Sequence, residues 1–103
     1  MLVLPIKKKW FDMIKSGEKK EEYREIKEYY GSRFGKLGVG DRTIKEIILR
    51  NGYSSNSPAI KCQVLINIGT GKEEWGAEPN KEYFVLKILK VKVVKRYEED
   101  ENN

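Results

Sequence analysis

The sequence predicts an α+β domain built on a small, strongly curved β-sheet or barrel of five to six mostly antiparallel strands, with one or two short helices placed early. Apolar and polar residues alternate cleanly from Ile60 to Ile68, which is typical of a strand. A second alternation runs from Tyr83 to Lys95, but its apolar positions change parity partway along. Such a change requires a bulge, a sharp bend or a change of sheet, and small curved barrels turn corners in this way. No helix pattern separates the later strands, so we do not expect a regular βαβ series.

The N-terminal part mixes short strands with short helices. Residues 2–4 are a brief apolar run that predicts a strand. The helical stripe that follows consists of Ile6, Trp10, Met13 and Ile14, with Gly17 as its C-terminal end. Residues 19–25 then predict a charged strand. Residues 26–34 suit one or two helical turns, which we expect Gly31 and Gly35 to break.

The rest of the chain predicts strands joined by turns and loops. A glycine-rich turn at 38–41 precedes a β-branched strand at 44–50, and a polar loop follows at 51–58. Residues 69–80 predict another loop before the final strand. In that strand one face holds Phe84, Leu86 and Ile88, and the other holds Leu89, Val91 and Val93.

Length and charge indicate one basic domain. The chain has 103 residues, and we expect a single domain over residues 1–97 followed by an acidic tail at 98–103 that is disordered. The tail holds four of the 16 acidic residues and none of the 21 basic ones, so residues 1–97 carry a net charge of +9. Such a domain suits an anionic partner, most often nucleic acid, although lysine-rich surfaces also serve solubility.

Composition narrows the chemistry. The sequence has no histidine and a single cysteine, Cys62, so it has no Ser-His-Asp or Cys-His arrangement, and we expect no metal and no cofactor. Cys62 lies in the apolar alternation, which indicates a core residue. No stretch has the length of a membrane span or of a signal-peptide core, so we expect a cytoplasmic protein with no membrane partner.

The most informative segment is residues 17–24 (GEKKEEYR). In an extended conformation Glu22 and Arg24 share one face, and Glu21 and Tyr23 share the other. A strand charged on both faces contributes little to a core. Two explanations remain open: a polar pocket for a ligand, or an internal ion-pair network that closes one end of the barrel.

Three side chains of this segment have complementary chemistry. Arg24 can bind a carboxylate or phosphate through two parallel hydrogen bonds, and Lys19 can reach the same volume. Glu22 between two cations remains an acceptor, which suits the exocyclic amine of a base. Alternatively, Lys19 acts as a proton acceptor if burial lowers its pKa, with Glu22 as the second catalytic residue.

Aromatic and acidic residues elsewhere extend this hypothesis. Tyr53 and Trp75 lie in loops, where stacking on a base and packing within the loop are equally good explanations. Trp10 belongs to the apolar helical stripe and is better explained as core. Glu78 is a candidate for a second carboxylate at the site. The basic residues that can contact phosphate are Lys7, Lys8, Lys9, Lys87, Lys90, Lys92, Lys95 and Arg96.

Residues 17–24 match the G-x-K-x-x-E-x-R signature of the ASCH domain, and the chain resembles small bacterial and phage members of that family in the PUA-like superfamily. Further similarities are an aromatic-bearing helix before the signature, Gly-Asp at 40–41 before a strand, and residues 75–78 (WGAE) before the last strand. The resemblance covers about residues 2–95. It implies a PUA-like β-barrel with a cleft beside the signature.

The resemblance also implies a class of ligand. The superfamily is associated with RNA and modified bases, one ASCH branch removes an acetyl group from cytidine, and another is reported as a ribonuclease. The deacetylating branch has a nucleophilic Thr where this chain has Glu22, and a carboxylate does not replace an alkoxide. Its further catalytic acid lies before the last strand, where Glu74 and Glu78 are candidates.

Three functions follow as hypotheses. The first is binding of RNA or a nucleotide-like small molecule through Lys19, Glu22 and Arg24, with Tyr53, Trp75 and Glu78 as further contacts. The second is a hydrolase acting on a modified nucleoside or on RNA, with Lys19 and Glu22 as catalytic residues. The third is an interaction protein in which the charged cluster is purely structural.

Overall fold

The computed structural model describes residues 1–94 of the chain. Lys95 and the acidic tail expected at 98–103 lie outside the described residues. The elements in chain order are β1 (Val3–Pro5), α1 (Lys8–Ser16), β2 (Glu21–Arg24), α2 (Glu28–Leu37), β3 (Lys45–Arg50), β4 (Ala59–Thr70), the short 3₁₀ helix η1 (Glu73–Trp75) and β5 (Glu82–Val94). No helix within residues 1–94 has the length and hydropathy needed to cross a membrane.

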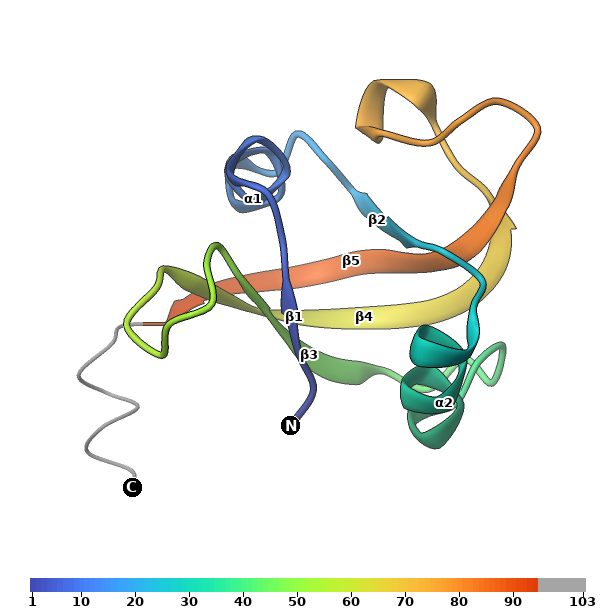
Figure 1. Cartoon of the computed structure of the whole chain (residues 1–103), viewed down its shortest axis with the longest axis horizontal. Coiled ribbons are helices and arrows are strands. Elements are labelled where there is room, and N and C mark those ends of the chain that lie inside the picture. Colours follow the sequence, from blue (N-terminus) through green and yellow to red (C-terminus); the bar gives the residue numbers. More distant parts are fainter. Residues whose placement is uncertain (95–103) are drawn as a thin grey trace.

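The strands form one curled sheet in the order β1-β3-β4-β5-β2. The β1–β3 pair is parallel, and the other three pairs are antiparallel. Figure 1 shows β4 and β5 as two long, bent strands at the centre of this half-barrel, with the two helices at opposite corners of the view. The predicted fold class is therefore confirmed: an α+β domain on a small curved sheet, with five strands among the described residues.

The parity change predicted in the last strand corresponds to a β-bulge. Gln63 pairs with Lys90 and the next residue, Val64, pairs with Ile88, so Leu89 is an extra residue in β5. Before the bulge the inward side chains of β5 include Leu86, and after it Val91 takes the inward position opposite Cys62. A bulge of this kind bends the strand and increases its twist, which accounts for the curvature of the sheet.

The core fills the concave side of the sheet. Cys62 is fully buried, as predicted. Phe11 and Ile14 of α1 and Phe34 of α2 cover the strands from the two ends. The core residues are Leu4, Ile6, Phe11, Ile14, Phe34, Ile47, Leu49, Ile60, Cys62, Val64, Ile66, Phe84 and Leu86.

The prediction that two glycines break the second helix is wrong. α2 continues through Gly31 and Gly35 and ends before Gly38, whose φ of 106° suits only glycine. Glycine in a helix interior costs only about 1 kcal/mol relative to alanine, and tertiary packing exceeds that cost. Phe34 is fully buried, and its ring stacks on that of Tyr30 one turn earlier.

Candidate functional site

The charged segment becomes the edge strand β2 because α1 ends sharply before it. Gly17 adopts a left-handed conformation, with φ 89°, and its N–H donates to the carbonyl of Ile14. β2 then pairs with β5, which places Glu22 opposite Leu86 and Arg24 opposite Phe84. The two charged side chains therefore share one face, as the alternation predicted, and that face is the core-facing side of the sheet.

Glu22 stands between two cations. Its Oε1 lies 3.3 Å from the Nζ of Lys19, and its Oε2 lies 2.8 Å from the Nη2 of Arg24. Arg24 Nε also donates to Oε2 at 3.0 Å. The exposed fractions of Lys19, Glu22 and Arg24 are 1%, 6% and 8%, so the cluster is both buried and paired. Buried charges require such partners.

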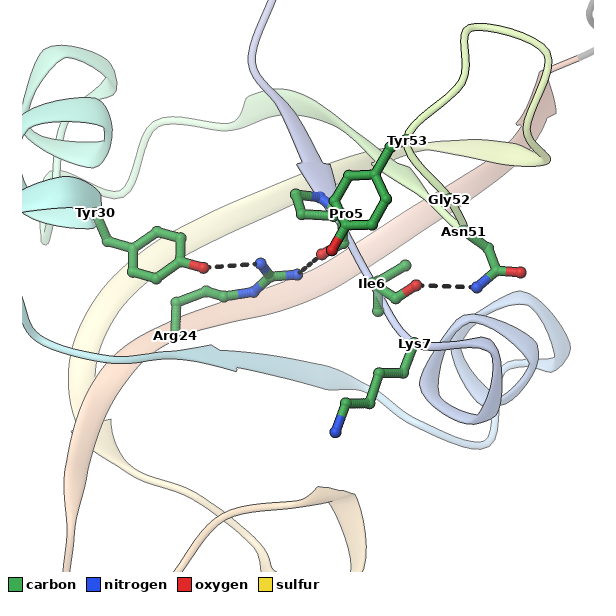
Figure 2. A pocket seen from close by; sticks show the side chains of 8 residues that line it. All are labelled: Pro5, Ile6, Lys7, Arg24, Tyr30, Asn51, Gly52 and Tyr53. Carbon is green, nitrogen blue, oxygen red and sulfur yellow. Dashed lines mark hydrogen bonds between the residues drawn. The ribbon is translucent and has the colours of Figure 1, made fainter.

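Arg24 also connects β2 to two other parts of the fold. Its Nη2 donates to the carbonyl of Pro5 at 2.8 Å, and its Nη1 donates to the hydroxyl of Tyr30 at 3.2 Å. Figure 2 shows this guanidinium between Tyr30 of α2 and the end of β1. All three nitrogens of the guanidinium are engaged, so its position is determined by the fold.

Lys19 is the most enclosed member of the cluster. Its Nζ donates to the carbonyl of Trp75 at 2.6 Å and lies 4.8 Å from the ring centre of Trp10 and 4.9 Å from that of Tyr23. Burial lowers the pKa of Lys19; Glu22 opposes that shift, and Arg24 adds to it. Lys19 thus links Glu22 of β2 to Trp75 of η1, and it contacts Glu22 within the buried cluster.

A continuous groove passes over this cluster. It has three sections with volumes of about 390, 310 and 260 Å³, and neighbouring sections share lining residues. The first section is lined by Pro5, Ile6, Lys7, Arg24, Tyr30, Asn51, Gly52 and Tyr53 (Figure 2). The last is lined by Trp10, Glu22, Tyr23, Glu25, Trp75, Gly76, Glu78 and Tyr83. We call these three sections together the β2 groove.

Charge changes sign along the β2 groove. The first section, here the basic section, has Lys7 and Arg24 and no acid among its lining residues. The last section, here the acidic section, has Glu22, Glu25 and Glu78 and no base. A ligand with an anionic group at one end and hydrogen-bond donors at the other matches this gradient.

Lys81 borders the acidic section. Its Nζ lies 3.0 Å from a carboxylate oxygen of Glu25 and 3.1 Å from one of Glu78. Hydrogen bonds to Glu25 first and Glu78 second raise the pKa of Lys81 to about 12. The ammonium therefore stays charged and links the end of β2 to the loop before β5.

The structure brings most of the predicted site residues together. Glu22 and Arg24 line the β2 groove; Tyr53 lines its basic section and is 92% exposed. Trp75 and Glu78 line its acidic section. Lys19 is the exception, since its side chain lines none of the three sections. It is buried in the fold, where it contacts Glu22 and the carbonyl of Trp75.

Two of the other candidates occupy different positions. Glu74 is exposed and lines no section of the groove. Trp10 packs against the core, as expected, but it also lines the middle and acidic sections. The apolar stripe of α1 predicted that Trp10 packs against the core. Nothing in the sequence indicated that the same side chain also borders the groove.

Sequence reasoning missed two contributors to the basic section. The Tyr30 hydroxyl accepts from Arg24, and Asn51 donates from its Nδ2 to the carbonyl of Ile6 at 3.0 Å (Figure 2). Tyr30 lies in the segment expected to form helical turns, and its polar hydroxyl was the available signal. Asn51 begins a polar loop, and nothing else in the sequence indicated that it lies at the groove.

No family model, curated protein or solved structure matches this chain. Any function proposed for this chain therefore rests on its own residues, on the groove and on the charges that line it.

Proposed function

We propose that this chain is an ASCH-like binding module whose β2 groove holds a nucleotide or a short segment of single-stranded RNA. The observation that carries the proposal is the charge gradient along the groove past Glu22 and Arg24. The phosphate lies in the basic section near Lys7 and Arg24, and the base lies in the acidic section.

The acidic section suits a base with an exocyclic amine. Glu22 has its two oxygens oriented by Lys19 and Arg24, and a carboxylate has about four lone-pair positions, so capacity remains for a donor from the ligand. Trp10 and Trp75 border the same volume. Stacking of a base on such a side chain contributes roughly 1–3 kcal/mol.

Binding has more support than hydrolysis. The Lys19 amine already contacts the Trp75 carbonyl and Glu22, and it lines no part of the groove. A catalytic amine has to reach the proton that it accepts. Turnover of acetylated cytidine or cleavage of RNA that disappears in Lys19→Ala would favour the hydrolase instead.

The test is titration of the protein with nucleoside monophosphates and with fluorescein-labelled single-stranded RNA across a salt series. Lys7→Ala and Tyr53→Ala remove exposed groove residues and are expected to leave the fold intact. Both should weaken binding, and Lys7→Ala should also reduce its salt dependence.

Matched controls are Lys36→Ala and Tyr29→Ala on α2, outside the lining of the groove. They should bind like the wild type. The proposal fails if the wild type binds neither ligand, or if the groove variants and the controls behave alike.

A further inference from the structure

The convex side of the sheet carries four lysines on β4 and β5, which we call the lysine face: Lys61, Lys87, Lys90 and Lys92. Their neighbours Cys62 and Leu86 are buried in the core, so alternation directs these lysines outward. Lys87 and Lys90 differ in parity, and regular pairing would place them on opposite sides of β5. The bulge at Leu89 places them on the same side.

The lysines are close together, and three of them have no acid directly opposite; the fourth, Lys87, lies opposite Glu21 of β2. Lys61 lies directly opposite Lys92 in the antiparallel pair, and Gln63 lies opposite Lys90. Together with Glu46, these residues line a shallow hollow of about 90 Å³. Over residues 1–94 none of the four lysines forms an ion pair.

Internal packing does not explain this arrangement. Like charges directly opposite each other on a sheet are destabilising. The four side chains are exposed or half-exposed, so they add little to the core. A partner with regularly spaced negative charges removes the repulsion and gains counterion release.

We propose that the lysine face binds the sugar–phosphate backbone of RNA as a second contact surface beside the β2 groove. The inference rests on the proposed function, because it places the flanking nucleotides of the same ligand. β5 connects the two surfaces: Tyr83 lines the acidic section, and Lys87, Lys90 and Lys92 follow along that strand. The bulge adds no length: the partners of Lys87 and Lys92 on β4 are four residues apart, so at about 3.4 Å per residue the two lysines are roughly 14 Å apart, a length that a few nucleotides span.

The test compares a mononucleotide with a single-stranded RNA long enough to reach both surfaces. In Lys61→Gln/Lys92→Gln, RNA affinity should fall, and the slope of log K against log salt should decrease in magnitude by about 1.4, or 0.7 for each lost phosphate contact. Mononucleotide affinity should stay unchanged. The melting temperature should not fall, because the substitutions remove a repulsion, so the loss of RNA binding cannot be attributed to unfolding.

The control Lys15→Gln/Lys36→Gln removes the same charge from the exposed last turns of α1 and α2 and should keep the wild-type salt slope. Equal losses of RNA affinity in both double variants would show that the effect depends only on net charge, and this would overturn the inference. Lysine-dependent binding to anionic vesicles without RNA binding would also overturn it.

The two proposals fail in different ways. If Lys7→Ala and Tyr53→Ala bind RNA like their controls but RNA binding still depends on Lys61 and Lys92, the groove proposal fails and the lysine face stands as an independent surface. If Lys7→Ala weakens RNA binding and the lysine-face variant does not, the groove stands and the inference fails.

Discussion

Glu22 and Arg24, two residues apart on one face of β2, meet in a double contact: both Nε and Nη2 of the guanidinium lie within 3.0 Å of the Oε2 of the carboxylate. Both side chains are more than nine-tenths buried, yet both line the β2 groove. The pair is thus packed within the fold on one side and borders the β2 groove on the other, a geometry that is compatible with both explanations that the sequence left open.

Glu22→Gln should destabilise the fold strongly. The substitution leaves Lys19 and Arg24 buried without their anion, and breaking a buried pair in this way costs about 3–5 kcal/mol. The free energy of unfolding from urea titration measures the loss. Glu18→Gln changes an exposed carboxylate in the same segment and should have an effect within about 0.5 kcal/mol.

The double variant Glu22→Gln/Arg24→Met should lose less stability than the sum of the two single variants, because each substitution removes a partner of the other. Additive losses would show that the two side chains act independently, contrary to the contact described above.

Asp41 should make the fold sensitive to acid. Its carboxylate accepts from the Lys45 ammonium first, and also from the backbone N–H and hydroxyl of Thr43, which lowers its pKa from 3.8 to about 2. The folded state holds this carboxylate ionised more strongly than the unfolded state, so its contribution is complete above pH 3.8 and disappears as the pH falls towards 2.

Asp41→Asn should therefore be less stable than the wild type at neutral pH, and the difference should shrink across that acid range. Asp12→Asn, in an exposed pair with Lys8, is the matched control for the change of charge. Parallel stability curves of Asp41→Asn and the wild type down to pH 2 would contradict the assignment.

Cys62 should be chemically inert in the native protein. Burial raises the pKa of its thiol to about 12, and the side chain has no solvent exposure. The thiolate is the reactive form, so native protein at mildly alkaline pH should not react with a disulfide reagent such as DTNB, and denatured protein should react with one equivalent. Rapid modification without denaturant would show that the sheet opens at β4.

Sequence patterns predicted the elements whose structure depends on residues close together in the chain. The alternation around Cys62 identified β4. The parity change required a bulge, a sharp bend or a change of sheet, and the structure has a bulge at Leu89. The end of α1 at Gly17 also followed from its sequence. Each of these depends on neighbours within a few residues.

The features that prediction missed depend on contacts distant in the sequence. Lys19 was expected to face a ligand, but it contacts the carbonyl of Trp75, 56 residues away. α2 passes through Gly31 and Gly35 because the buried Phe34 anchors it from within the fold. Neither the position of η1 nor the depth of the core can be inferred from periodicity, so these two outcomes required the structure.

Gly76 should not tolerate a side chain without a change at the acidic section. Its φ is 100°, and a Cβ there would lie 2.9 Å from the Trp10 ring. Gly76→Ala should lower stability by about 1–2 kcal/mol for the left-handed backbone alone. It should also weaken nucleotide binding, because η1 must move away from Trp10 and the acidic section changes shape. Urea unfolding and nucleotide titration on the same sample measure both effects.

Gly31→Ala provides the opposite control for that experiment. A Cβ at Gly31 meets nothing within 4 Å, and the residue lies inside α2, where alanine is the better helix former. The substitution should raise the free energy of unfolding by about 0.5–1 kcal/mol and leave nucleotide affinity unchanged. If Gly76→Ala instead retained both wild-type stability and affinity, the close approach of η1 to Trp10 would not exist in solution, and the acidic section of the groove would lose one of its walls.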